Sequence, residues 1–268
     1  MSSRSVRLGL LVLTLLTGLS GLPGPTATAS AGPVPAAPSP SAEERRLDGA
    51  VPREILRRSG FDEVAPRFTR QLERARSRAE AGSLDAAYRE IEELAAHQRI
   101  RVVGETGLDY FRTGPNGVGV QQDSFRWHID LAKRLGKALQ IHDRDAHDDV
   151  LRILGEEGAP DRTVMHCFSG DVGIARQCVE RGYFLSFAGT VTFKNARSLR
   201  DALAVTPLEQ VLVETDAPYL TPAPWRGATN APYLVPLTVR VMAGVMGVAV
   251  PTLCQALSAN SERVYGAW

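Results

Sequence analysis

The hydrophobic positions of this 268-residue chain form short apolar runs that alternate with longer amphipathic stretches from about residue 80 onward. Helical periodicity is clearest in residues 84–96 and 121–135, where apolar side chains recur on one face. Between such stretches, five runs have the length and the β-branched content of buried strands, and they lie near residues 100–105, 138–142, 162–168, 183–188 and 210–215. This alternation predicts βα repeats and a parallel sheet.

Four of these runs end in a side chain that can bind a metal ion: Glu105, His142, His166 and Asp216. In a parallel α/β barrel the carboxyl ends of the strands form the mouth, where such enzymes carry out their chemistry. Each polar residue could also simply mark the place where a strand meets solvent. Because four metal-competent side chains share this position, we expect them to be ligands.

The residues around these candidates form five distinct blocks. They are Gly104-Glu105-Thr106-Gly107-Leu108-Asp109-Tyr110, Ile141-His142-Asp143-Arg144-Asp145-Ala146, His166-Cys167-Phe168-Ser169-Gly170, Ser186-Phe187-Ala188-Gly189-Thr190-Val191-Thr192-Phe193-Lys194-Asn195 and Glu214-Thr215-Asp216-Ala217-Pro218-Tyr219-Leu220. In order and approximate spacing they resemble the TatD-type metal-dependent deoxyribonucleases, over about residues 80–265. The resemblance implies an α/β fold, a TIM-type (β/α)8 barrel of the metal-dependent hydrolase kind, which cleaves phosphodiester bonds with DNA as substrate.

Carried over position by position, the resemblance implies that Glu105 is shared by two divalent metal ions and that His142 and His166 complete one site. Asp216 would bind the other ion and help to activate water, so that Glu105 and Asp216 are the expected catalytic residues. Carboxylate and imidazole ligands admit Mg, Mn or Zn. Two alternatives stay open: a related metallohydrolase that acts on an ester or amide, and a non-catalytic remnant of the family.

The His-x-His pair that the family carries on its first strand is missing. The chain has five histidines, His97, His128, His142, His147 and His166, and no two of them are separated by a single residue. His97 lies in a polar stretch and is expected at the surface, whereas His128 and His147 fit helix faces and are expected to pack there. A closed barrel has eight strands, and five are recognisable from residue 80 onward. The barrel is therefore predicted to be incomplete at its N-terminal strands.

Three basic residues are candidates for binding the substrate: Arg144, Lys194 and Arg226. Each could equally be an ordinary surface charge or part of a salt bridge at the rim. The loop around Arg226 departs from the family, in which an Arg and a Glu flank the Asn; here Thr229 and Ala231 stand in those places. This departure removes two groups that could contact the substrate or support the site.

The residues that orient the metal ligands can also be predicted. A metal-bound imidazole usually donates its second N–H to a carboxylate or carbonyl. Asp143 and Asp145 are close to His142 in the sequence, so one of them is expected to hold that ring.

The N-terminal 79 residues lack the alternating strand and helix pattern of the rest of the chain. Residues 1–31 have a charged start, an apolar segment and small residues at a cleavage position, which is the pattern of a secretory signal. A Pro/Ala-rich linker and an Arg-rich polar segment fill residues 32–79, expected to be solvated and helical or unstructured, and the hydrolase domain is placed at 80–268. Either the enzyme is an exported variant that has lost its first βα units, or the front end is foreign to it; we favour the second. The resemblance predicts a cytoplasmic enzyme, and a genuine signal predicts a secreted one.

Composition narrows the function only slightly. A formal charge of +1 argues against a protein that coats long nucleic acid, although a nuclease that engages a few phosphates is compatible with it. Cys167, Cys178 and Cys254 form neither a disulfide framework nor a zinc spacing. No protein partner and no stable membrane association after signal cleavage are predicted.

Overall fold

The computed structural model describes residues 71, 74–75, 77, 83–113 and 117–267 of the chain. The predicted signal at 1–31 and nearly all of the segment at 32–79 lie outside these residues, and the alternatives for the front end stay predictions.

The described part contains one parallel sheet, which confirms the prediction of βα repeats. Its five strands follow one another in sequence order, each paired with the next. They are β1 (Val102–Asp109), β2 (Ala138–Arg144), β3 (Thr163–Met165), β4 (Phe184–Phe187) and β5 (Val211–Val213). Each strand overlaps one of the five predicted runs. This order of parallel strands with intervening helices is that of an α/β barrel wall.

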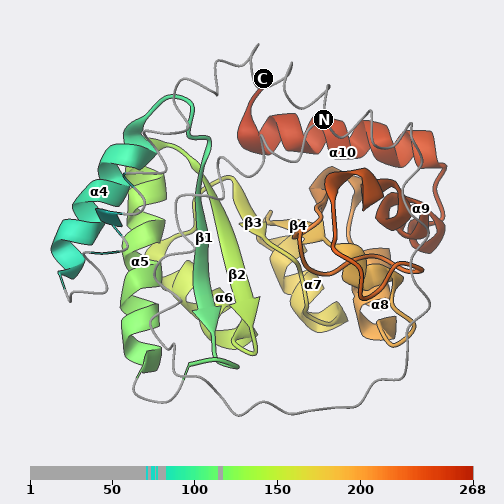
Figure 1. Cartoon of the computed structure of the whole chain (residues 1–268), viewed down its shortest axis with the longest axis horizontal. Coiled ribbons are helices and arrows are strands. Elements are labelled where there is room, and N and C mark those ends of the chain that lie inside the picture. Colours follow the sequence, from blue (N-terminus) through green and yellow to red (C-terminus); the bar gives the residue numbers. More distant parts are fainter. Residues whose placement is uncertain (1–70, 72–73, 76, 78–82, 114–116, 268) are drawn as a thin grey trace.

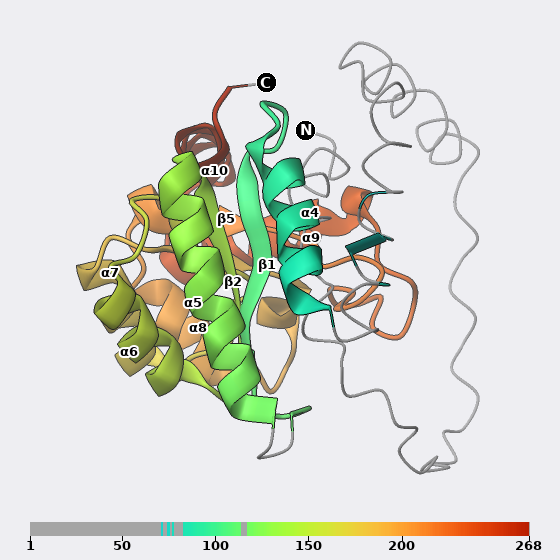
Figure 2. The same ribbon diagram turned by 90° about the vertical axis from the view of Figure 1, so that its left-hand side faces the viewer.

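Helices precede, connect and follow the strands, and those between the strands cover the outer face of the sheet. They are α4 (Leu84–Ala96), α5 (Val118–Leu135), α6 (His147–Glu157), α7 (Val172–Glu180), α8 (Arg197–Ala204), α9 (Val235–Met246) and α10 (Val250–Tyr265), with short 3₁₀ turns η2 (Gly189–Thr192), η3 (Leu208–Gln210) and η4 (Pro232–Leu234). Figures 1 and 2 show α5 alongside β1 and β2, whereas α10 runs across the end of the sheet where β1 begins. At the opposite ends of the strands, the loops after β3 and β5 carry two of the four candidate ligands, His166 and Asp216.

Side chains from the strands alternate between two apolar layers, as the pleat of a strand requires. Outward-facing residues such as Val103, Leu139 and Leu185 join the main core beneath the helices. Residues at the starts of the strands point to the inner face and pack against Val264, with Tyr265 beside them; these are Val102, Ala138, Val164, Phe184 and Leu212. The inner face is therefore closed by α10 at the amino ends of the strands.

The first strand extends furthest beyond its predicted bounds, whereas β3, β4 and β5 are shorter than the predicted runs. The sequence pattern ends the first strand at Glu105, but β1 continues to Asp109 and its register with β2 shifts between Val103 and Thr106. Gly104 and Gly107 adopt φ angles of 157° and 139°, the second of which lies well inside the region that favours glycine. The irregularity lets the strand bend and continue, so that Glu105 lies in the middle of β1.

Within the described ranges, no single helix is long and apolar enough to cross a membrane. The stretch Pro232–Met246 and α10 meet that criterion only as a pair, by length and composition, and they are bent by 108° at the break between them.

His128 packs in α5 as predicted, and its environment makes stability depend on pH. The ring is fully buried, its Nδ1 lies 2.7 Å from the carbonyl of Ser124, and Tyr88 and Trp127 contact it edge-on. Burial lowers the pKa of His128 to about 3, although the hydrogen bond to Ser124 opposes the shift. The folded protein therefore binds fewer protons than the unfolded chain. The contribution of the neutral His128 ring to the free energy of unfolding is complete above about pH 6.5, the pKa of histidine in the unfolded chain. It is lost as pH falls toward 3, the pKa in the folded protein.

We expect His128→Phe to remove this dependence. Between pH 7 and pH 5 the wild-type free energy of unfolding should fall by about 2 kcal/mol more than that of the variant, as measured by urea unfolding at each pH. His97→Gln is the control, because His97 is partly exposed at the end of α4. Equal slopes for wild type and His128→Phe would show that His128 is not a buried neutral imidazole.

Candidate metal centre

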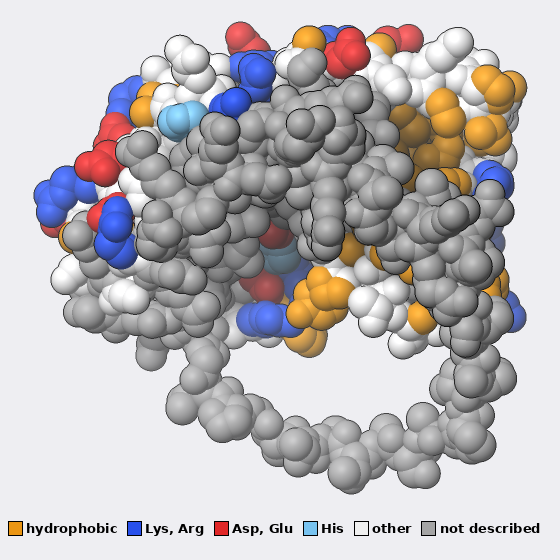
Figure 3. Space-filling model, turned by 45° about the horizontal axis from the view of Figure 1, so that its top comes forward, with side chains coloured by type: hydrophobic (Ala, Val, Ile, Leu, Met, Phe, Trp, Pro, Cys, Tyr) orange, Lys and Arg blue, Asp and Glu red, His pale blue; other side chains and the backbone are white. Residues whose placement is uncertain are grey.

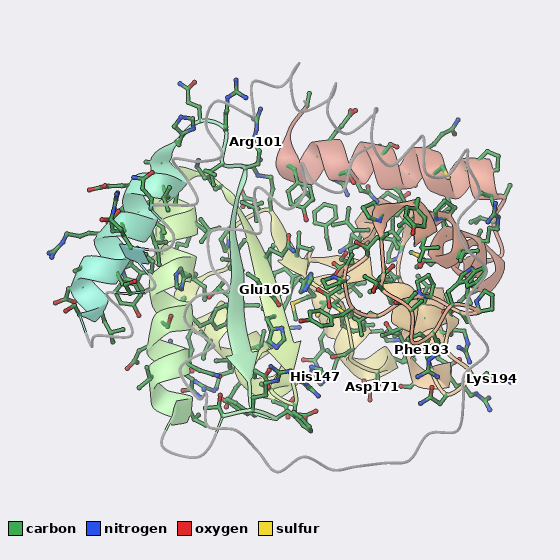
Figure 4. The ribbon with its side chains drawn as sticks, viewed as in Figure 1. Arg101, Glu105, His147, Asp171, Phe193 and Lys194 are labelled. Carbon is green, nitrogen blue, oxygen red and sulfur yellow. The ribbon has the colours of Figure 1, made fainter. Side chains whose placement is uncertain are left out.

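The structure brings the four predicted ligands together at the inner face of the sheet. Glu105 is central: its Oε1 lies 2.7 Å from His142 Nδ1 and 3.4 Å from His166 Nε2. Asp216 Oδ1 is 4.0 Å from the same nitrogen of His166. Glu105 comes from β1, His142 from β2, His166 from the residue after β3, and Asp216 from the loop after β5. Figure 4 shows Glu105 near the middle of the molecule, among side chains from several strands.

Backbone contacts explain why the loop ligands lie here. The backbone N–H of His166 donates to the carbonyl of Ile141 at 2.9 Å, which continues the pairing of β2 with β3 by one residue. Asp216 adopts a left-handed conformation with φ of 50°. The side chain of Asn230, which is 4% exposed, donates to the carbonyls of Thr215 and Tyr219 on either side of Asp216. A buried amide therefore fixes the loop that carries Asp216.

Each histidine of the centre has a carboxylate on both sides of its ring. His142 Nε2 lies 3.3 Å from Asp109 Oδ2, opposite the contact with Glu105. His166 Nδ1 lies 2.8 Å from Glu214 Oε1 and 3.2 Å from Gln140 Nε2. One nitrogen faces the candidate ligands and the other faces a supporting group, which is the usual arrangement of metal-binding imidazoles.

The prediction that Asp143 or Asp145 holds His142 is wrong. Asp143 Oδ2 instead lies 2.6 Å from His147 Nδ1, and Asp145 is exposed. Successive residues of a strand point to opposite faces, so Asp143 cannot share the face of His142. His147 begins α6 and pairs with Asp143, as a histidine at a helix edge; its pKa is raised by that hydrogen bond, with further contributions from the charges of Asp143, Asp145 and Asp171. Figure 4 labels His147 and Asp171 in the same region.

Sequence reasoning missed three supporting residues: Asp109, Gln140 and Glu214. The signal that was available is the two-residue period of a strand, because Gln140 precedes His142 by two and Glu214 precedes Asp216 by two. Asp109 is four residues beyond Glu105, and its place depends on the irregularity in β1.

The charges of the centre shift one another strongly. Burial would raise the pKa of Glu105, but the hydrogen bond to His142 and the charges of the two histidines lower it overall. Burial would lower the pKa of His166, yet Glu214, Glu105 and Asp216 raise it to about 10. Burial, together with Glu214 and Glu105, raises the pKa of Asp216 to about 6. Glu105, Asp216 and Glu214 repel one another when all are ionised, so a positive charge between them stabilises the centre.

The donor set has the chemistry of a divalent-metal site. Two imidazoles and two carboxylates surround one region, and supporting groups hold the second nitrogen of each ring. Within the described part of the chain, no group of three or more His, Cys, Asp or Glu residues has the geometry of a metal site as it stands. The donor atoms pair with one another instead, so a bound ion requires local rotation of these side chains.

The three basic candidates lie in different settings. The guanidinium of Arg144 stacks on the Phe111 ring at 3.8 Å, and that of Arg226 stacks on the Phe193 ring at 4.0 Å. Lys194 is exposed and lies at the edge of the molecule in Figure 4, away from Glu105. Figure 3 shows acidic and histidine side chains in a recess with basic and hydrophobic side chains beside it.

Cys167 is next to His166 but is poorly suited to be a nucleophile. Burial and the charges of Glu214, Asp216 and Glu105 raise its pKa well above the ordinary value, so the sulfur remains a thiol. Cys167, Cys178 and Cys254 are all free.

Comparison with known proteins gives matches over most of the chain. Residues 66–266 match the model of the family described as "TatD related DNase", and residues 26–98 match one described as "PA0049 N-terminal domain". An "uncharacterized metal-dependent hydrolase TatD" of Mycobacterium tuberculosis is 50% identical over 186 residues, which cover 68% of this chain and 70% of that protein. An "uncharacterized metal-dependent hydrolase YcfH" of Escherichia coli K12 is 44% identical over 177 residues, 66% of each chain.

Solved structures agree with these matches. The crystal structure of YJJV, a TatD homolog from Escherichia coli K12, superposes with a TM-score of 0.65 at 28% identity over 69% of this chain and 71% of that one. A TatD family hydrolase from Entamoeba histolytica superposes with a TM-score of 0.60 at 20% identity, covering 72% and 71% of the two chains, and supports the fold alone.

Proposed function

The chain belongs to the TatD-related family of metal-dependent hydrolases, and from this premise we propose that it is a deoxyribonuclease that hydrolyses phosphodiester bonds. The cofactor of the family is a divalent cation, and the fold is that of an α/β barrel. The observation that carries the proposal is the convergence of Glu105, His142, His166 and Asp216 on one face of the sheet.

In this proposal the same four residues hold the metal ion. Glu105 contacts both histidines and occupies the central position. Asp109 and Glu214 orient His142 and His166 from behind. A bound divalent ion supplies water of lowered pKa and offsets negative charge on the attacking and leaving oxygens.

Asp216 is the proposed acceptor of the proton from the attacking water. Its side chain is 32% exposed, whereas those of Glu105 and His166 are 17% and 5% exposed. Of the two carboxylates proposed as ligands, it is therefore the one that water reaches more easily. A proton acceptor must be within hydrogen-bonding reach of the water, and in this proposal the loop after β5 presents Asp216 to it.

Arg144 and Arg226 support a phosphodiester rather than an ester or amide. Arg144 follows His142 by two residues on β2, and Arg226 belongs to the loop that leads from β5 to α9. A planar guanidinium binds phosphate oxygens in a bidentate way, and stacking on an aromatic ring pre-orients it. Lys194 is exposed and is proposed as a weaker contact.

We expect the purified full chain, supplied with Mn²⁺, to shorten end-labelled DNA oligonucleotides and to stop when EDTA is added. Gel analysis of the labelled products measures this directly. Nitrophenyl ester and anilide substrates, tested under the same conditions, should be hydrolysed far more slowly. Hydrolysis of the ester or anilide without cleavage of DNA would overturn the phosphodiester proposal and favour the alternative metallohydrolase.

A matched pair of arginine variants tests in the same assay whether Arg144 contacts the DNA substrate. Arg144→Ala is expected to raise KM for DNA by about tenfold, because one phosphate contact is lost. Arg240→Ala is the control, since Arg240 is exposed on α9. If both variants kept the wild-type KM for DNA, Arg144 would not contact the substrate.

A further inference from the structure

The inner face of the sheet contains a second layer above its apolar floor. The floor residues at the starts of β2, β3, β4 and β5 are Ala138, Val164, Phe184 and Leu212. Two residues further along, the same face carries Gln140, His166, Ser186 and Glu214. On each of these four strands the inner face thus changes from apolar to polar two residues beyond the floor, and one member of the polar set, His166, is itself a candidate metal ligand.

These four side chains form one connected network. Glu214 Oε1 and Gln140 Nε2 lie 2.8 Å and 3.2 Å from His166 Nδ1. The hydroxyl of Ser186 donates to the other oxygen of Glu214. Gln140, His166 and Ser186 are 2%, 6% and 3% exposed, so the network is shielded from water. Glu214 Oε1 is buried without a hydrogen-bond partner among the described residues, so a proton on His166 Nδ1 would complete the network.

The far end of this network is a residue of the last helix. Tyr265, the final residue of α10, donates its hydroxyl to Gln140 Oε1 at 3.1 Å, across 125 positions of sequence. Its ring packs against the apolar floor. A phenylalanine would fill the same space, so the hydroxyl contributes only the contact with Gln140.

β1 leaves room for the glutamine. Gly104 occupies the matching position on β1, and a Cβ there would lie 2.7 Å from Gln140 Cβ and from its carbonyl oxygen. A larger residue at 104 would therefore push β2 or the glutamine aside. The glycine and the tyrosine together define the position of the Gln140 amide.

We propose that Gln140 and Tyr265 are positioning residues that hold the His166 ring with Nε2 directed at Glu105 and Asp216. The inference rests on the proposed role of His166 as a metal ligand. A ring that binds a metal ion through Nε2 carries its proton on Nδ1, and that N–H then donates to Glu214 and to the oxygen of the Gln140 amide. The amide is then turned so that its nitrogen donates to the oxygen of Tyr265, which fixes its orientation. Loss of either residue lets the ring rotate, so that more free energy is spent on ordering it when a metal ion binds.

The test measures Mn²⁺ affinity on the full chain by competition with a fluorescent chelator, without any activity assay. Tyr265→Phe is expected to weaken Mn²⁺ binding about fivefold, and Gln140→Met about tenfold or more, which is the range found for groups that support metal ligands. In the double variant the loss should equal that of Gln140→Met alone, because Tyr265 acts only through the glutamine.

Tyr183→Phe is the matched control. Tyr183 is 6% exposed and packs in the outer core next to β4, away from the network, so its loss of a hydroxyl should leave Mn²⁺ affinity unchanged. Thermal unfolding of every variant checks that the fold is kept; both replacements preserve side-chain volume. Unchanged affinity in folded Tyr265→Phe and Gln140→Met, or additive losses in the double variant, would overturn the proposal.

His166→Ala separates this inference from the proposed function. If His166→Ala leaves Mn²⁺ affinity intact, His166 is not a ligand, and the proposed metal site fails. If His166→Ala abolishes binding whereas the Gln140 and Tyr265 variants bind normally, only the positioning inference fails.

Discussion

Replacement of Glu105 by alanine is expected to lower DNA hydrolysis by about 10³-fold or more, the largest loss among single substitutions at the centre. Its Oε1 lies within 3.4 Å of nitrogens of both His142 and His166, so one carboxylate organises the whole donor set. Without it, the two rings lose their shared partner and the metal ion loses a central ligand. Initial rates on an end-labelled oligonucleotide, measured at saturating Mn²⁺, test the expectation.

Cys167→Ser is the control for Glu105→Ala, because Cys167 directly follows the candidate ligand His166 in the sequence. Because its sulfur stays protonated, hydrolysis should change by no more than about twofold. Circular dichroism of both variants separates loss of activity from loss of fold. An inactive serine variant beside an active Glu105→Ala would rule out the metal-centred mechanism and require a nucleophilic cysteine.

The strands and the four candidate ligands could be predicted from the sequence for one physical reason. A parallel strand buried on both faces is a short run of apolar residues, and a polar residue at the end of such a run is conspicuous. His166 follows directly after β3, and Asp216 lies three residues beyond β5. Glu105 follows the same rule, because it ends the apolar run that begins at Val102, although β1 continues beyond it to Asp109.

Contacts between strands could not be predicted in the same way. Proximity in the sequence suggested Asp143 for His142, but the alternation of a strand turns that carboxylate toward His147. The actual partner, Asp109, comes from a different strand and depends on the register between β1 and β2. Tyr265 is further still from Gln140 in the chain, and only the crossing of α10 over the strand ends brings them together. Such pairings follow from tertiary packing rather than from local pattern.

The second large effect is expected for Gly107→Ala, which should destabilise the fold by about 3 kcal/mol or more. Gly107 has φ of 139°, a conformation that residues with a Cβ rarely adopt. It pairs with His142 on β2, and an added Cβ would lie 2.0 Å from the carbonyl oxygen of His142. The contact is with backbone, so no side-chain rotation relieves it. The two strands must separate where they carry Glu105 and His142.

Urea unfolding and Mn²⁺ titration of the same Gly107→Ala preparation measure both consequences, and we expect weaker metal binding together with the loss of stability. Gly155→Ala is the matched control: Gly155 lies in α6, with nothing within 4 Å of an added Cβ. There alanine should raise stability by about 0.5–1 kcal/mol, because it favours the helix over the unfolded chain. If Gly107→Ala were as stable as wild type and bound Mn²⁺ normally, β1 would not have the backbone course that places Glu105 beside His142.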